Sequence, residues 1–166
     1  MKRLILMRHA KSSWDDPGQP DHDRPLNDRG IRAATRIGEW LRARGYRPDR
    51  ALVSTAARAQ QTWTCIAEAL DQPPMEPRPE IYHAPPARMF ALLQAAENAG
   101  CLMLIGHQPG IGAIVGDLLR TPEPAIDPAR YPTAALSVLD FEIGAWADLA
   151  WRTGRLKEHV RPRDLA

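Results

Sequence analysis

Two arginines and two histidines in this 166-residue chain have the chemistry needed to bind and transfer a phosphoryl group. Arg8 and His9 come directly after an apolar run, Arg58 lies one turn into an expected helix, and His107 follows a second apolar run. A guanidinium binds two oxygens at once and keeps its charge. A neutral imidazole is nucleophilic near pH 7 and forms covalent intermediates. Together these side chains would suit a compact anion such as phosphate.

Taken singly, each of these residues also has a structural explanation. A histidine after a strand is more often a hydrogen-bonded structural residue. An arginine near a helix start is by default a solvated charge or a surface ion pair. The glycine and proline around His107 suit a tight turn. For His22 and His159 we accept the structural interpretation. For the other four, the chemical interpretation depends on the fold bringing them together.

The expected strands are apolar stretches at residues 2–7, 51–53, 101–105 and 135–141, with a last one around 149–153. The last two are expected to pair as a hairpin. The expected helices begin after Asn27, after Ser54-Thr55, near Arg88, and after the turn that contains His107. They end at Gly45, near Leu70, at Gly100 and near Leu119 in turn. Residues 10–26 are expected to be a long polar loop, and residues 71–86 to be irregular.

Strands that alternate with helices predict an α/β fold, a three-layer α/β/α sandwich with a mostly parallel central sheet. The chain has no repeat and no linker, so residues 1–166 are expected to form one domain. Ligands of such sheets bind beyond the carboxyl ends of the strands. The strands that end before Arg8, Arg58 and His107 would therefore face one crevice.

Composition excludes several other classes of function. The 22 basic and 20 acidic residues are too evenly balanced for a nucleic-acid surface. No apolar run is long enough to cross a bilayer, and the run that ends at Met7 is too short for a signal peptide. Cys65 and Cys101 form no pair motif and are expected to be buried in a reducing cytoplasm. Carboxylates, cysteines and histidines lack metal-ligand spacing, so we expect no metal and no cofactor.

Four segments carry a resemblance to a known family. They are Arg8-His9-Ala10, Pro25-Leu26 with Gly30, Ser54 to Thr62 with Arg58 between them, and Gly106-His107. In order and spacing they resemble the histidine phosphatase superfamily, which has the phosphoglycerate mutase-like fold. The short chain and the segments Ile81-Tyr82-His83-Ala84 and Tyr131-Pro132-Thr133 are most similar to its SixA branch. That branch is associated with removing phosphate from phosphohistidine on signalling proteins.

The resemblance implies a role for each matched residue. His9 would be the nucleophile, and Arg8, Arg58 and His107 would bind the phosphoryl oxygens and stabilise the transition state. Water would then attack phospho-His9 and release phosphate. We also predict that Arg24 binds substrate, together with Arg8, Arg58 and His107. No metal would be needed, because the arginines supply the charge.

Two departures from the family pattern bear on the site. Ala10 replaces the usual glycine, and Asp15 stands where the family often has asparagine. A carboxylate facing phosphate would be unfavourable, so Asp15 is expected to point away. The general acid is predicted to be Glu80 on approximate position, with Asp21 as its rival and His83 as a third candidate. A phosphohistidine substrate needs little help from an acid, since its leaving imidazole can already carry a proton.

The leading hypothesis is a cytoplasmic, metal-independent phosphatase that acts on a phosphohistidine protein. A phosphomonoesterase for a small metabolite is the alternative, and a phosphate- or phosphoprotein-binding module without turnover is a third hypothesis of another class. The short chain favours an open site and a large substrate, because insertions usually build the lid over small ones.

Overall fold

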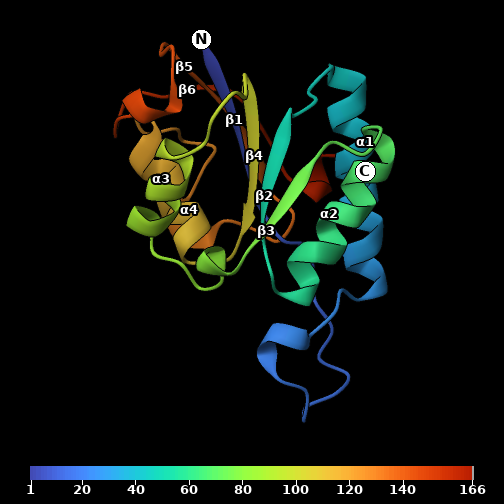
Figure 1. Ribbon diagram of the computed structural model, residues 1–166. Helices are drawn as coiled ribbons and strands as arrows, with labels where there is room; N and C mark the ends of the chain where they lie inside the picture. Colours follow the sequence, from blue (N-terminus) through green and yellow to red (C-terminus); the bar gives the residue numbers. More distant parts are fainter. Residues whose placement is uncertain (166) are drawn as a thin grey trace.

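The computed structural model describes residues 1–165, which fold around one six-stranded sheet (Figure 1). The strands lie in the order β3-β2-β4-β1-β5-β6. Their bounds are β1 Lys2–Arg8, β2 Arg50–Ser54, β3 Met75–Arg78, β4 Cys101–Gly106, β5 Leu136–Phe141 and β6 Arg155–Val160. Strands β1 to β4 run parallel, while β5 is antiparallel to both β1 and β6. The predicted mostly parallel sheet is confirmed.

Four helices cover the two faces of the sheet, which completes the predicted three layers (Figure 1). Helices α1 (Asp28–Arg44) and α2 (Ala57–Ala69) lie on one face, and α3 (Pro86–Gln94) and α4 (Gly110–Leu118) on the other. Side chains of β1 alternate between the two layers, as the pleat requires. Leu4 and Leu6 pack into the cluster of α3 and α4, whereas Ile5 and Met7 pack into that of α1 and α2.

The ends of α1 follow the capping residues in the sequence. The Asn27 side chain accepts a hydrogen bond from the Gly30 amide, and Gly45 ends the helix with a left-handed φ of 76°. The start of α2 differs from the expectation, because its N-cap is Ala56. Ser54 instead ends β2, and its hydroxyl accepts from the Ala56 amide at 3.3 Å. The Ser54 side chain therefore remains at the carboxyl end of the sheet.

Three predicted elements differ from the structure. The last strand is residues 155–160 rather than 149–153, although it pairs antiparallel with β5 as expected. Leu149 is buried in the core next to a 3₁₀ turn, which explains its misleading apolar character. Helix α3 lies at residues 86–94 rather than 88–99. The expected irregular segment contains β3, a short edge strand in which Pro77 is tolerated.

Two further expectations concern the cysteines and membranes. Cys65 and Cys101 are free and half-buried rather than fully buried. Within residues 1–165, no helix is both long and apolar enough to span a bilayer.

Candidate active site

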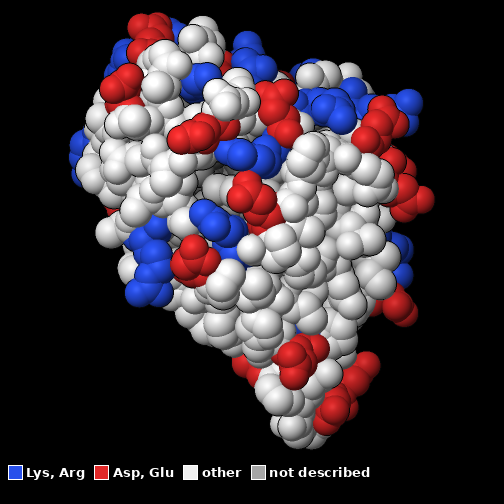
Figure 2. Space-filling model, in the orientation of Figure 1, with Lys and Arg blue, Asp and Glu red and all other residues white. Residues whose placement is uncertain are grey.

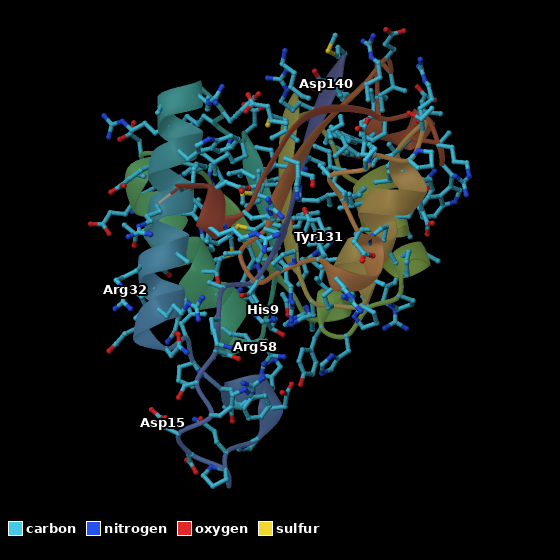
Figure 3. The ribbon with its side chains drawn as sticks, turned by 180° about the vertical axis from the view of Figure 1, so that it is seen from behind. His9, Asp15, Arg32, Arg58, Tyr131 and Asp140 are labelled. Atoms are coloured by element: carbon cyan, nitrogen blue, oxygen red, sulfur yellow. The ribbon has the colours of Figure 1, made fainter. Side chains whose placement is uncertain are left out.

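The carboxyl ends of β1, β2 and β4 carry a polar cavity of about 260 Å³. Its wall includes all four residues predicted to handle phosphate, namely Arg8, His9, Arg58 and His107. His9, Arg58 and His107 are each less than 10% exposed, and Figure 3 shows His9 beside Arg58 at this end of the sheet. The fold thus brings together side chains that lie far apart in the sequence.

The His9 ring is held so that one of its two nitrogens carries no proton. Its Nδ1 lies 2.7 Å from the carbonyl oxygen of Ala10, so Nδ1 carries the proton and donates it there. Nε2 is then an unprotonated nitrogen, which accepts a long hydrogen bond from Nε of Arg58 at 3.4 Å. Burial, together with the nearby arginines and against the opposing effect of the bond to Ala10, lowers the pKa of His9 to about 3. His9 is therefore neutral near pH 7.

Arg58 is fixed in place by Asp21. Its Nη1 donates to the backbone carbonyl of Asp21 at 2.7 Å, and its Nη2 donates to the carboxylate at 3.0 Å. The Tyr82 hydroxyl donates to the same carboxylate at 2.5 Å. This bond, together with those from Arg58 and Arg24, holds the pKa of Asp21 well below its usual range. Asp21 is thus an ionised carboxylate that positions Arg58.

Arg8 and His107 each hold a buried nitrogen without a hydrogen-bond partner in residues 1–165. These atoms are Nε of Arg8 and Nδ1 of His107. Each residue has one other nitrogen with a partner. Nη1 of Arg8 donates to the Tyr131 carbonyl at 2.9 Å, and Nε2 of His107 lies 2.7 Å from Oγ of Ser54. A buried donor left unpaired is costly, and both residues line the cavity, so an anion or water bound there would supply the missing partner.

The contact with Ser54 bears on which nitrogen of His107 carries the proton, because a hydroxyl can both accept and donate a hydrogen bond. Burial lowers the pKa of His107 to about 2, so the ring is neutral and holds one N–H. The Ser54 hydroxyl oxygen already accepts from the Ala56 amide. When the hydroxyl donates its own proton to Nε2 of His107, the His107 proton lies on Nδ1, which has no partner within residues 1–165. His107 is then a neutral donor with a free N–H.

The three candidate acids occupy different places. The structure does not bring Glu80 to the cavity. Glu80 lies on the 3₁₀ turn Pro79–Ile81, which buries Ile81 and leaves the Glu80 side chain 43% exposed. Its carboxylate lies 3.9 Å from the Arg78 guanidinium. Asp21 lines the cavity, and Nε2 of His83 lies 3.3 Å from its carboxylate. Glu80 therefore lies outside the wall of the cavity, whereas its rivals Asp21 and His83 are part of that wall.

Arg24 forms part of the cavity wall, with most of its guanidinium already occupied. It donates to the Ser12 hydroxyl at 2.6 Å and to the Asp21 carboxylate at 3.2 Å, and it lies over the Trp14 ring at 3.6 Å. Asp15 is exposed and lies far from His9 at the tip of the first loop, as expected (Figure 3). The loop of residues 10–26 thus closes one side of the cavity without turning Asp15 toward it.

The sequence patterns assign no chemical role to Ser54 or Tyr82, and both contact the core of the site. For Ser54 the available signal is its place at the end of a strand, where a side chain faces the crevice. Tyr82 carries no such signal, because it comes from an irregular segment. The histidines set aside as structural make structural contacts: His22 binds Thr55 at 2.9 Å and His159 binds Ser137 at 2.9 Å. In residues 1–165, no three carboxylate, cysteine or histidine side chains are grouped to hold a metal.

Comparisons with known proteins show the family of this chain. Residues 4–84 match the family model of the histidine phosphatase superfamily, branch 1. An uncharacterized protein of Mycobacterium tuberculosis is 36% identical over 149 residues, which cover 86% of this chain and 91% of that protein. This chain belongs to the histidine phosphatase superfamily, and the resemblance drawn from its motifs is confirmed.

Solved structures place it near SixA within that superfamily. A SixA protein of Agrobacterium tumefaciens is 33% identical, with a TM-score of 0.82 over 97% of this chain and 98% of that one. The protein histidine phosphatase SixA complexed with tungstate is 25% identical, also with a TM-score of 0.82, over 99% of each chain. The phosphoglycerate mutase-like fold expected from the resemblance is thereby confirmed.

Proposed function

We propose that this protein is a metal-independent phosphatase that removes phosphate from phosphohistidine on a signalling protein in the cytoplasm, with His9 as its nucleophile. One observation carries the proposal. A neutral, buried His9 with an unprotonated Nε2 lines a cavity whose walls include two buried nitrogens without a hydrogen-bond partner in residues 1–165, Nε of Arg8 and Nδ1 of His107. Phosphoryl oxygens would satisfy both donors. The likeness to SixA supports the choice of substrate.

The first step would move the phosphoryl group between two imidazoles. The lone pair on Nε2 of His9 attacks phosphorus, the new N–P bond forms, and the N–P bond of the substrate breaks. A substrate ring that is protonated on its other nitrogen leaves as neutral histidine, so charge and protons balance without a general acid. Arg8, Arg58 and the N–H of His107 stabilise the equatorial oxygens as charge spreads over them.

The second step would return the enzyme to its starting state. Water attacks phospho-His9, the N–P bond breaks, and its electron pair returns to Nε2. Both water protons remain on the product, dihydrogen phosphate. Throughout both steps, Nδ1 of His9 keeps its proton and donates a hydrogen bond to the Ala10 carbonyl oxygen. This bond holds the ring in one orientation.

The state of Asp21 favours phosphohistidine over a metabolite phosphoester. An alkoxide leaving group needs a proton, and general acids typically contribute about 10²- to 10⁴-fold. Asp21 is held ionised by Tyr82 and two arginines, and Glu80 lies outside the cavity, which leaves His83 as the remaining candidate acid at the site. A protonated imidazole leaves without such help. The unprotonated Nε2 of His9 also argues against a module that only binds phosphate.

The deciding experiment is a turnover screen. Wild-type protein is given a phosphohistidine protein and, in parallel, a panel of sugar, alkyl and aryl phosphoesters. We expect kcat/KM to be highest for the phosphohistidine protein, with competition by vanadate or tungstate and no loss of rate in EDTA. Preference for one phosphoester by tenfold or more would replace this proposal with the metabolite phosphatase. A strict requirement for added divalent metal would refute the mechanism.

A further inference from the structure

A second groove, of about 270 Å³, opens beside the catalytic cavity, and Lys11 and Thr133 line both. Three arginines complete its basic wall: Arg29 from the first turn of α1, and Arg161 and Arg163 from the C-terminal segment. Because the two spaces share a wall, a chain that leaves the cavity past Thr133 would enter this groove.

Three of the four cations that line the groove form no ion pair within residues 1–165. Arg161 is neutralised, since its guanidinium binds both carboxylate oxygens of Asp164 at 2.9 and 3.1 Å. Lys11, Arg29 and Arg163 form no ion pair within residues 1–165. Elsewhere the chain is nearly balanced in charge, and on the face in Figure 2 the basic groups lie among acidic ones. Three free cations in one groove therefore indicate an anionic partner.

The backbone that carries these cations is held firmly. The carbonyl of Lys11 accepts from the Asn27 amide at 3.0 Å, which ties the first loop to the start of α1. Leu165 packs against the core cluster under α1 and α2, and so anchors the 3₁₀ turn that carries Arg163. The side chains can adapt while their attachment points stay fixed, an arrangement that suits an extended partner.

We propose that the groove binds an acidic segment of the phosphoprotein next to its phosphohistidine, while the phosphoryl group occupies the catalytic cavity. This inference rests on the proposed function and adds the chemistry of the flanking chain. Exposed ion pairs are individually weak, but complementary charge steers association and fixes register. The contribution should appear in KM and decline with added salt, because screening is strong at physiological ionic strength.

Two synthetic phosphohistidine peptides test the proposal. They have the same length, with four glutamates on each side of the phosphohistidine in one and four glutamines in the other. At low salt we expect wild-type KM for the acidic peptide to be lower by about tenfold, with similar kcat. The variant Arg29→Glu/Arg163→Glu should lose that preference and keep its kcat on both peptides. Neither arginine lines the catalytic cavity.

The control is Arg120→Glu, an exposed arginine just beyond the far end of α4. It should leave the preference intact, and phosphoramidate turnover verifies that every variant is folded and active. Equal KM values for the two peptides with wild type, or equal losses in the groove variant and the control, would overturn the groove proposal alone. Turnover of small phosphoesters with neither peptide accepted would overturn the proposed function as well.

Discussion

The unprotonated nitrogen of His9 is the residue-scale feature on which the chemistry depends. Replacing it in His9→Ala should abolish turnover, because no other side chain in the cavity presents an unprotonated imidazole nitrogen beside Arg58. The fold should survive, since His9 follows the last residue of β1 and belongs to neither hydrophobic cluster. His159→Ala is the matched control and should retain activity, because His159 lies away from the cavity and binds Ser137. Near wild-type turnover by folded His9→Ala would contradict the mechanism.

Arg58 and His107 should each matter through geometry as well as charge. Arg58→Ala and His107→Ala are expected to lower kcat/KM on the order of 10²-fold, the scale of one preorganised contact. Arg58→Lys should recover only part of the loss, because an ammonium cannot reach Asp21 and the phosphoryl group together. Full recovery by lysine, measured under the same conditions, would show that charge alone suffices.

Asp21 and Glu80 are separated by a comparison of leaving groups. If Asp21 acts by positioning Arg58, Asp21→Asn should slow phosphohistidine and aryl phosphoester to the same extent. Glu80→Gln should change neither rate, since its carboxylate faces Arg78. Steady-state rates on the two substrates decide the matter. A loss confined to the phosphoester in either variant would identify that residue as a general acid.

At the scale of elements, the start of α1 supports the first loop through one close contact. A Cβ at Gly30 would lie 2.1 Å from the Lys11 carbonyl oxygen. Gly30→Ala should therefore push the loop away from α1, lower the free energy of unfolding by about 1–3 kcal/mol and reduce kcat, because this loop carries Asp21 and Arg24. Gly144→Ala, where a Cβ meets open space, should do neither. Urea unfolding and turnover measure the two effects.

The sequence predicts the elements best where local signals and burial agree. Asn27 and Gly45 bound α1 as expected, and the wholly apolar core of β4 is unmistakable. The last strand was misplaced because Leu149 is apolar yet packs beside a 3₁₀ turn, while β6 is rich in charge. Such charge is typical of an edge strand, which must avoid pairing with other chains. Local pattern does not reveal which strand takes the edge.

The residues of the site, like the elements, were predictable where a local signal marks them and not where their place depends on distant contacts. Arg8, His9, Arg58 and His107 were identifiable because each stands at the carboxyl end of a parallel strand or just beyond it. The place of Glu80 was not predictable because it depends on the irregular segment before α3, whose path follows from the burial of Ile81. Tyr82 and the ion pair of Asp21 with Arg58 depend on contacts between segments 37 and 61 residues apart. Sequence spacing carries no signal for such contacts.

At the scale of the whole molecule, the buried histidines make stability depend on pH. The pKa of His9 is about 3 and that of His107 about 2 when folded, against 6.5 ordinarily. Between pH 6.5 and pH 3 the unfolded chain binds protons on these two histidines, whereas the folded chain does not. The free energy of unfolding is therefore highest above pH 6.5 and falls as the pH falls toward 3. Urea midpoints across this range should decline less in His9→Gln/His107→Gln. An unchanged slope would contradict the assignment.

The central place of β1 has a consequence for how the chain is made. This strand is translated before both of its neighbours in the sheet, β4 at residues 101–106 and β5 at residues 136–141. Until both have emerged, the apolar run Leu4 to Met7 has at least one unpaired edge, which is a template for aggregation. Closing such distant pairs is slow. The nucleophile at the end of β1 thus gains its pocket only when most of the chain has been translated.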